Sequence, residues 1–344
     1  MTRQRLPNNA LSRVLRWAAG HTNTAKERPK RQRAPRTHII LIDGTLSTLK
    51  EGHETHIGWL YKQLGQSTIS TSVHYISGLQ WGNWRTSWRV LVGRGLSAQI
   101  QEAYGVLAAR YRPGDLIYMF GYSRGAFAVR SLSGMIDSVG LLRQEFATSR
   151  HMDRVWRRYR GARRSEDFKS QYCYDDVKIN MMGIFDTVSA LSVNLPWFAQ
   201  ILPDNYSFHN HRISDCILAG YHALALDETR AAYAPERWET DEEGARHEMQ
   251  QVWFSGSHAD VGGHLLGEEE ARPLSNIPLI WMMEHAERHG LQLPTDWRDG
   301  LHVDPNAPSV GMSRGLRRLI WVRMKRKVKP SYFEWIHPSV SERN

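Results

Sequence analysis

One stretch in the first half of the chain, from Asp115 to Ala126, constrains the fold more than any other. It is an apolar, nearly uncharged segment that runs into Gly121-Tyr-Ser-Arg-Gly125 and then into a helical pattern. In a Gly-x-Ser-x-Gly motif, the glycines allow a sharp turn between a strand and a helix, and the serine is held exposed at the edge of a sheet. The pattern predicts such a nucleophile elbow, with Ser123 as the nucleophile.

The flanking residues strengthen this interpretation. Beyond the serine, apolar side chains recur at helical spacing, at Ala126, Val129, Leu132, Ile136 and Val139. The structural alternative is a glycine-rich turn in which the serine only caps the helix. A strand before the motif and a helix after it are the context that the catalytic interpretation requires, so this interpretation is favoured.

The composition is that of a globular protein. With 344 residues, 41% of them hydrophobic, and 13 Trp, the chain can build one large α/β domain or two small ones. Two cysteines, Cys173 and Cys216, argue against a disulfide scaffold. No apolar run is long enough to span a bilayer, and no secretory signal is visible. We expect a cytoplasmic protein, or one exported without a signal peptide, that can be peripheral to a membrane.

The basic charge is concentrated at the N-terminus. Residues 1–37 carry ten Lys or Arg and one acid, a charge of +9 out of +10 for the chain. We therefore predict a basic, disordered tail over residues 1–36 and a catalytic domain over residues 37–344. The tail can contact anionic lipid or nucleic acid, or it can be a solvated arm.

Strands and helices are expected to alternate along the rest of the chain. The pattern predicts strands at residues 38–42, 115–120, 177–185, 248–255 and 319–324, and helices at residues 96–112, 150–164, 214–226 and 277–289. This order favours an α/β fold with a mostly parallel central sheet covered by helices on both faces. The arginine-rich helix at 150–164 and the uncharged, aromatic segment 187–203 are candidates for cap insertions and for contacts with lipid.

Four polar residues, Asp43, Ser123, Asp186 and His258, directly follow predicted strands. In a parallel sheet the carboxyl ends of the strands meet at one edge, where ligands bind. A serine hydroxyl needs a histidine to take its proton and an acid to orient that histidine. We predict Asp186 as the acid, in the order Ser123, Asp186, His258 that α/β-hydrolases use.

Two of these assignments have alternatives. His258 closes a strand and opens a glycine-rich turn, whereas His337 comes late in the chain after an aromatic segment. Asp260 is the second candidate for the acid, although its place in a tight turn favours a role as a loop anchor. For the oxyanion hole we expect the backbone N–H of Arg124 and a second N–H from the Gly44-Thr45 turn.

Several motifs together resemble the α/β-hydrolase-like family that includes the type VI secretion phospholipase effectors. The resemblance covers residues 37–341 and rests on Ile42-Asp-Gly-Thr45, Gly121-Tyr-Ser-Arg-Gly-Ala126, Phe185-Asp-Thr-Val188, His222-Ala-Leu-Ala-Leu-Asp-Glu228, Trp253-Phe-Ser-Gly-Ser-His-Ala-Asp-Val-Gly-Gly263, Leu274-Ser-Asn-Ile-Pro-Leu-Ile-Trp-Met282 and His337-Pro-Ser-Val340. It implies a Ser-Asp-His hydrolase of lipid esters, phospholipids in particular, with His258 as the base. His264 departs from the family pattern, which more often has a glycine and then an aromatic residue there.

Other functions are less well supported. His258, Asp260 and His264 could form part of a metal site, but no second cluster of matching spacing exists, and we expect no cofactor. An aspartate-dependent phosphatase would need a second Asp at Leu41. A non-enzymatic or degenerate hydrolase-fold module, tethered by the basic tail, remains the main alternative. We expect a lipid substrate rather than nucleic acid, and the sequence leaves the oligomeric state open.

Overall fold

The computed structural model describes residues 33–65, 70–79, 95–161, 166–188, 212–239, 248–311 and 322–344. The chain divides into two units, Met1–Ala34 and Pro35–Asn344. The first unit, which carries most of the predicted basic tail, lies almost wholly outside the described residues. The second unit contains the sheet.

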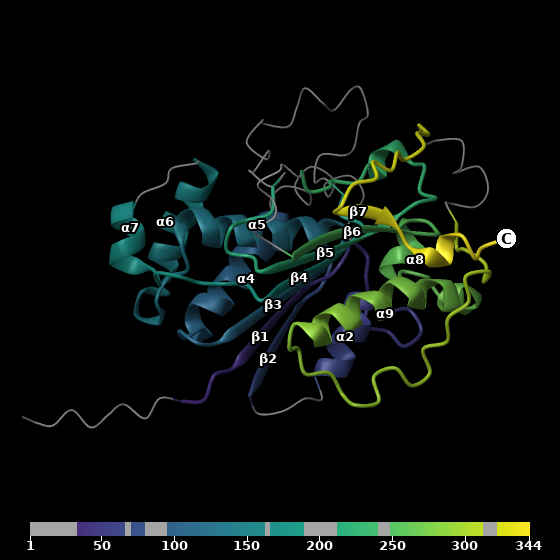
Figure 1. Ribbon diagram of the computed structural model, residues 1–344. Helices are drawn as coiled ribbons and strands as arrows, with labels where there is room; N and C mark the ends of the chain where they lie inside the picture. The colour runs from purple at the N-terminus through teal and green to yellow at the C-terminus, as the bar shows by residue number, and fades with distance from the viewer. Residues whose placement is uncertain are drawn as a thin grey trace, which may run out of the picture. The chain divides into compact units, whose positions relative to one another are not determined.

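The second unit is a three-layer α/β structure (Figure 1). Its strands are β1 (Thr37–Ile42), β2 (Thr71–Ile76), β3 (Leu116–Tyr122), β4 (Met181–Phe185), β5 (Ala219–Ala225), β6 (Glu248–Phe254) and β7 (Glu334–Ile336). Its α-helices are α2 (His56–Leu64), α4 (Leu96–Arg110), α5 (Arg124–Val139), α6 (Ser149–Arg160), α7 (Glu166–Tyr172), α8 (His258–Gly262) and α9 (Arg272–Arg288). Among the described residues, no helix combines the length and the apolar character needed to cross a bilayer.

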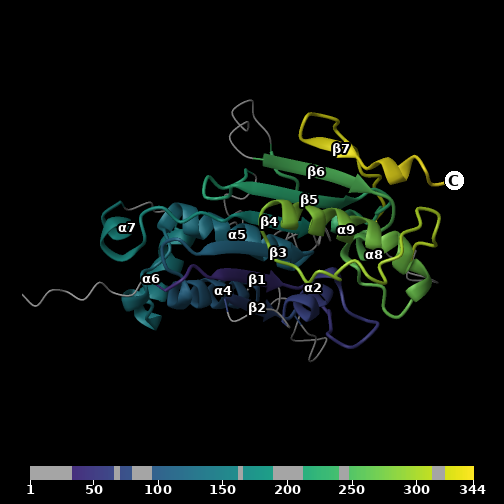
Figure 2. The ribbon, with the colours of Figure 1, turned by 60° about the horizontal axis from the view of Figure 1, so that its bottom comes forward.

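The seven strands form one sheet in the order β2-β1-β3-β4-β5-β6-β7, and every neighbouring pair is parallel. Figure 2 shows this order from β2 at the bottom to β7 at the top. The predicted α/β fold with a parallel central sheet is therefore confirmed. The strand order reverses at β1, because β2 lies on one side of it and β3 on the other. Crevices at such reversal points, outside the carboxyl ends of the strands, are where ligands bind in open α/β sheets.

A separate apolar core fills each face of the sheet. On one face α4 and α5 pack against β1 and β3, through residues such as Ile100, Leu107 and Val129. On the other face α2 and α9 cover the sheet through residues such as Leu60 and Met282. The central strands are buried on both faces, which is why they read as nearly continuous apolar runs.

One predicted element was wrong, and a second lies partly outside the described residues. Residues 214–226 were expected to be a helix, but they contain β5, all seven residues of which are buried between β4 and β6. A short apolar run buried on both sides has no periodicity that separates a strand from a helix. The last strand was expected at residues 319–324. Residues 319–321 lie outside the described residues, and in residues 322–324 Arg323 forms an isolated bridge with Arg230. Among the described strands, β7 at Glu334–Ile336 is the edge strand next to β6.

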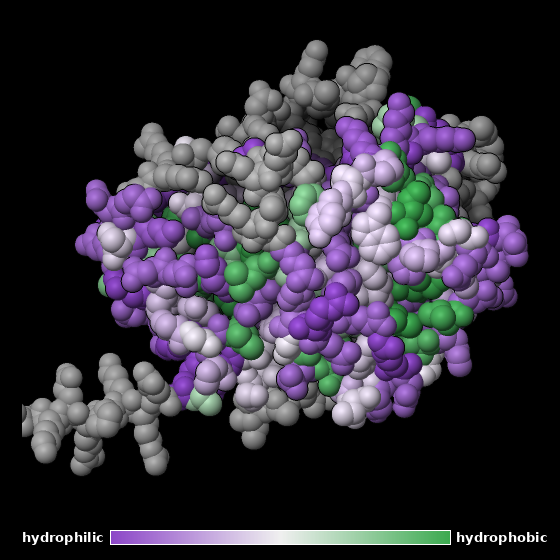
Figure 3. All heavy atoms as spheres, viewed as in Figure 1, coloured by the Kyte–Doolittle hydropathy of each residue, from purple (hydrophilic) through white to green (hydrophobic). Residues whose placement is uncertain are grey.

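The arginine-rich segment does form a helix, α6, but as part of a helical layer rather than a cap. α6 packs on α4 and α5, and Figure 1 places α6 and α7 at the opposite end of this unit from α8. Hydrophilic side chains cover the end where α6 and α7 lie (Figure 3). Two arginines of α6 lie over aromatic rings of α7. Arg158 is 4.3 Å from the ring centroid of Phe168, and Arg154 is 5.0 Å from that of Tyr172. The other predicted cap segment, residues 187–203, lies outside the described residues except at Thr187 and Val188.

Candidate active site

The strand, the strained serine and the helix that the sequence predicts around Ser123 are present in the structure. β3 ends at Tyr122 and α5 begins at Arg124, so Ser123 alone makes the turn. Its φ of 57° lies in the left-handed region, which non-glycine residues rarely adopt. Its N–H donates to the Phe185 carbonyl at 3.0 Å, which ties the turn to the end of β4. Strain of this kind is typical of functional residues that the surrounding structure holds in place.

The two glycines of the motif allow the backbones to approach closely. A Cβ added to Gly121 would lie 2.6 Å from the Gly125 carbonyl oxygen. A Cβ added to Gly125 would lie 2.0 Å from the Ile42 carbonyl oxygen, at the end of β1. Any side chain here would separate α5 from the sheet and move Ser123.

We expect Gly125→Ala to destabilise the protein and displace the elbow. Overpacking against fixed backbone should cost about 1–3 kcal/mol in the free energy of unfolding, measured by urea denaturation. Gly105→Ala is the matched control. It lies inside α4, where the new Cβ would meet only the Met152 side chain at 3.5 Å. The explanation fails if the Gly125 variant is as stable as the Gly105 variant.

Ser123, His258 and Asp186 lie within hydrogen-bond distance of one another in a single chain of contacts. His258 Nδ1 lies 2.6 Å from Asp186 Oδ2, and His258 Nε2 lies 2.9 Å from Ser123 Oγ. Because an ionised carboxylate can only accept hydrogen bonds, His258 Nδ1 carries a proton and donates a hydrogen bond to Asp186. Nε2 is then the acceptor for the Ser123 hydroxyl. All three side chains are buried, with residue exposures of 6%, 5% and 0% for Ser123, His258 and Asp186.

Asp186 is held in an unusual backbone conformation and in an ionised state. Its φ is 41°, and its Oδ1 accepts the N–H of Ala225 at 3.0 Å. Burial acts to raise the pKa of this carboxyl, but the positive charge of Arg326 and the hydrogen bond from His258 outweigh burial and hold the pKa well below its usual value. The adjacent N–H of Thr187 donates to His222 Nε2 at 3.1 Å, which fixes the turn after β4.

A second layer of contacts fixes His258. Its N–H donates to Glu228 at 3.3 Å, and Glu228 is paired with Arg230 at 2.7 Å. The imidazole packs against the rings of Tyr122 and Tyr233, each with a centroid 4.9 Å away. Together these contacts leave the ring little freedom to rotate.

The turn after β1 lies beside the elbow. A Cβ on Gly44 would lie 2.5 Å from the Tyr122 ring, next to Ser123. Asp43 accepts hydrogen bonds from Thr55, Tyr75 and the Gly44 N–H, and burial raises the pKa of Asp43 to about 6 against those bonds.

The contacts of this turn bear on the predicted oxyanion hole. Because the Gly44 N–H is used by Asp43, Thr45 is the residue of this turn that can offer an N–H. Thr45 Oγ1 is also buried and has no hydrogen-bond partner among the described residues. Arg124 is the first residue of α5, and its N–H is one of those that a helix leaves without an intrahelical acceptor.

The alternative site residues have other contacts. His337 Nδ1 accepts the Ser339 N–H at 3.2 Å and so caps a short 3₁₀ helix at Pro338–Val340, while its ring stacks on Phe254. Asp260 accepts hydrogen bonds from Ser257, Ser309 and the Val310 N–H, as expected of a loop anchor.

Of the three residues considered for a metal site, His258 and Asp260 make the hydrogen bonds described above, whereas His264 Nε2 is buried with no hydrogen-bond partner among the described residues. His264 lies edge-on to Tyr122, and burial is the main reason that the pKa of His264 is lowered to about 4. Within the described ranges, no group of three or more His, Cys, Asp or Glu side chains is arranged to hold a metal ion.

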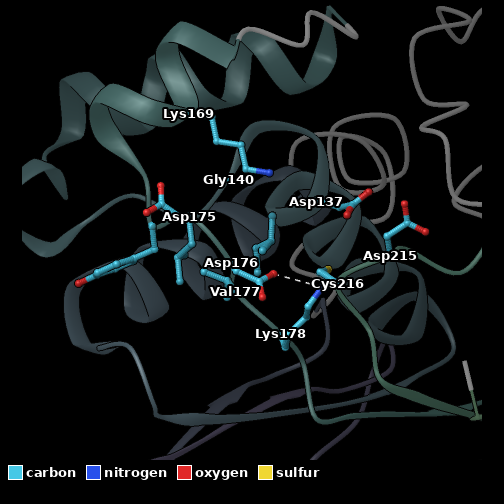
Figure 4. A pocket seen from close by; sticks show the side chains of 12 residues that line it. Asp137, Gly140, Lys169, Asp175, Asp176, Val177, Lys178, Asp215 and Cys216 are labelled. Atoms are coloured by element: carbon cyan, nitrogen blue, oxygen red, sulfur yellow. Dashed lines mark ion pairs between the residues drawn. The ribbon is translucent and has the colours of Figure 1, made fainter. Parts of the chain in front are cut away.

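A hollow of about 110 Å³ lies elsewhere, between the end of α5, α7 and the segment before β4 (Figure 4). Its charged lining residues are Asp137, Lys169, Asp175, Asp176, Lys178 and Asp215, of which Asp176 and Lys178 pair at 3.1 Å. None of the predicted site residues lines it. The hollow is therefore not part of the candidate site around Ser123.

The sequence profile of the family described as "T6SS, Phospholipase effector Tle1-like, catalytic domain" matches residues 36–285, well over half of the chain. The chain belongs to this family. The resemblance inferred from the motifs is thus confirmed, and the match spans the segments that carry Asp43, Ser123, Asp186 and His258.

The individual relatives of this Tle1-like chain are distant. The protein YEL023C of Saccharomyces cerevisiae, described as uncharacterized, is 34% identical over 152 residues, which are 40% of this chain and 21% of that protein. The chain thus spans about a fifth of the length of the curated relative that it matches. The structure of the Tle1 effector bound to the VgrG spike of the type VI secretion system aligns at 17% identity over 67% of this chain and 51% of that one, with a TM-score of 0.40. The structure of Est1E from Butyrivibrio proteoclasticus aligns at 12% identity over 75% and 92%, with a TM-score of 0.36.

Three residues of the candidate site carry no signal in the sequence and were not predicted: Arg326, Glu228 and Arg230. Glu228 ends the family motif at residues 222–228, in which no role was predicted for it. Arg326 belongs to a run of Lys and Arg residues that lies beyond the C-terminal end of the family match. A solvated basic run and a buried arginine look the same in a single sequence.

Proposed function

We propose that this protein is a serine hydrolase that cleaves carboxylic esters of lipids through an acyl-enzyme on Ser123. The observation that carries the proposal is the contact chain from Ser123 Oγ to His258 Nε2, at 2.9 Å, and from His258 Nδ1 to Asp186, at 2.6 Å. This series of hydrogen bonds begins at Ser123, in a strained turn at the carboxyl edge of a parallel sheet. Nucleophile, base and orienting acid in this order form the arrangement that activates a serine hydroxyl.

In the proposed reaction, Ser123 Oγ attacks the ester carbonyl while His258 Nε2 takes the hydroxyl proton. Asp186 holds the imidazole in the required tautomer and stabilises its charged form. The N–H groups of Arg124 and Thr45 stabilise the oxyanion, with the Thr45 hydroxyl as a further donor. His258 then protonates the departing alcohol. Water, activated by the same histidine, attacks the acyl carbonyl and releases the acid and free Ser123.

The lipid character of the substrate is supported by two observations. The family is described as phospholipase effectors. Two leucines, Leu46 after the Gly44-Thr45 turn and Leu266 after α8, are 45% and 63% exposed. Apolar side chains that are exposed at these two positions are available for contact with an acyl chain or a lipid surface. Phospholipids are therefore the proposed substrate class.

The proposal is tested with soluble esters of increasing acyl length and with phospholipid vesicles, using Ser123→Ala as the control. We expect the wild-type protein to hydrolyse the esters and to release fatty acid from the vesicles. Cleavage of soluble esters without release of fatty acid would make the protein a carboxylesterase. The absence of hydrolysis of any ester by the folded protein would contradict the proposal.

We also propose that the basic N-terminal segment assists contact with an anionic membrane. Deletion of residues 1–36 should leave hydrolysis of a soluble ester unchanged, because β1 begins at Thr37. Binding to anionic vesicles, measured by cosedimentation, should weaken, and most at low ionic strength, since each basic residue near such a surface contributes about 1 kcal/mol and salt screens the attraction. Equal vesicle binding by the two proteins across a salt titration would refute this role. Loss of ester turnover would instead place the segment in the catalytic domain.

A further inference from the structure

Arg326 is a buried arginine in direct contact with the acid of the proposed triad. Its Nη1 donates to Asp186 Oδ1 at 2.5 Å and its Nη2 to Asp186 Oδ2 at 2.9 Å. The Arg326 side chain is 4% exposed and that of Asp186 is fully buried. The two residues therefore form a buried, bidentate ion pair. The planar guanidinium is well suited to this geometry.

The remaining contacts of the guanidinium fix it in place. Nη1 also donates to the Ala225 carbonyl at 2.7 Å, and Nη2 to the Tyr233 carbonyl at 2.5 Å. The backbone nearby is held as well, because the Met324 N–H donates to the Thr229 carbonyl at 2.7 Å. The segment around Arg326 is thus attached to the same loop that carries Glu228, Arg230 and Tyr233.

Both oxygens of Asp186 are shared between partners. Oδ2 accepts from His258 and from Arg326, and Oδ1 accepts from Ala225 and from Arg326. A carboxylate that is already neutralised by an arginine attracts a neighbouring imidazolium less than an isolated one does. Arg326 therefore acts on two properties of the site, the orientation of Asp186 and the charge that His258 faces.

We propose that Arg326 is a positioning residue of the triad: it clamps Asp186 in the orientation that receives the His258 proton, and it shares the carboxylate charge so that neutral His258 stays available as a base. This inference rests on the proposed serine hydrolase function. Arg326 itself touches Asp186 and backbone carbonyls, not the nucleophile.

Other charged or titratable groups also face this pair, and none of them is substituted in an Arg326 variant. They are Glu228 with its partner Arg230, His264, His222, Tyr122 and Tyr233. Because Arg326 also contacts the loop that carries Tyr233, Arg326→Lys, which keeps the positive charge, is needed to separate loss of the charge from movement of that loop.

The test compares Arg326→Gln and Arg326→Lys with Lys327→Gln, an exposed neighbour that undergoes the same change of charge. For Arg326→Gln we expect a lower plateau of kcat/KM on a soluble ester, and an acid limb of the pH profile moved up by about 1 pH unit. The direction follows because loss of the positive charge favours protonated His258, and the base must be neutral to act. Arg326→Lys keeps the positive charge but cannot make the bidentate contact with Asp186. The acid limb of its pH profile should therefore move less than that of Arg326→Gln, while its plateau of kcat/KM still falls about tenfold. Lys327→Gln should match the wild type.

A second measurement does not depend on activity. The downfield N–H proton of His258, which bonds to Asp186, can be followed by NMR as the pH is varied in each variant. We expect its titration to move to higher pH in Arg326→Gln and to be unchanged in Lys327→Gln. If the wild-type protein hydrolyses no ester, the proposed function fails, and this titration still decides the role of Arg326.

The inference is overturned if Arg326→Gln lowers the plateau but leaves both the acid limb and the NMR titration at their wild-type positions, since Arg326 would then be only structural. If Arg326→Gln does not fold, the activity and pH profile of Arg326→Lys test the inference. A wild-type plateau and pH profile in the lysine variant would overturn the inference as well.

Discussion

Ser123→Ala is expected to reduce hydrolysis of a soluble ester by about four orders of magnitude or more. The variant removes the only atom of the proposed triad that forms a bond to the substrate. The fold should be unaffected, because the Ser123 N–H that bonds to Phe185 is retained and alanine keeps the same Cβ at the strained turn. Initial rates, together with the thermal unfolding midpoint, check both parts.

The thermal unfolding midpoint distinguishes loss of the hydroxyl from loss of the fold as the cause of a reduced rate. A midpoint close to that of the wild type assigns the loss of rate to the missing hydroxyl. Retention of wild-type turnover by the folded variant would remove Ser123 from the mechanism and leave the elbow as a structural turn.

His258→Ala should be nearly as damaging as Ser123→Ala, and the double variant should be little worse than either single one. Residues that act as one unit lose their joint contribution when any one of them is removed, so their effects do not add. His258 is the side chain that contacts both Ser123 and Asp186. Steady-state rates of the two single variants and the double variant measure this non-additivity.

His337→Ala is the matched control, because His337 was the other candidate for the base. Its imidazole caps a 3₁₀ helix and stacks on Phe254, so its loss should reduce stability more than turnover. An inactive His337 variant beside a nearly normal His258 variant would transfer the role of the base to His337. Losses in the double variant that multiply would show that Ser123 and His258 act independently.

The elbow was predictable because its signals are local. Gly121 and Gly125 are demanded by backbone contacts under 3 Å that admit no Cβ, and the strand before them and the helix after them have clear patterns. The placement of Asp186 and His258 followed from a general property of parallel sheets, that their carboxyl ends share an edge. The end of a strand can be predicted from the sequence even when the strands that pair with it cannot.

Other features depend on contacts between distant segments and could not be read in this way. β5 was taken for a helix because its seven residues are buried on both sides, and only its pairing with β4 and β6 determines its conformation. Arg326 lies 140 residues from Asp186 in a run of basic residues, where burial of one arginine leaves no trace in the pattern. The use of the Gly44 N–H by Asp43 likewise depends on a hydrogen bond that the motif does not reveal.

Labelling with a fluorophosphonate, which reacts covalently with activated serines, tests the central claim most directly. We predict that one equivalent is incorporated, that peptide mass spectrometry places it on Ser123, and that labelling is lost in Ser123→Ala and strongly slowed in His258→Ala. The reason is that the reagent requires the same activation of Oγ as an ester substrate does. A folded wild-type protein that is not labelled, or one labelled equally well after Ser123→Ala, would contradict the account.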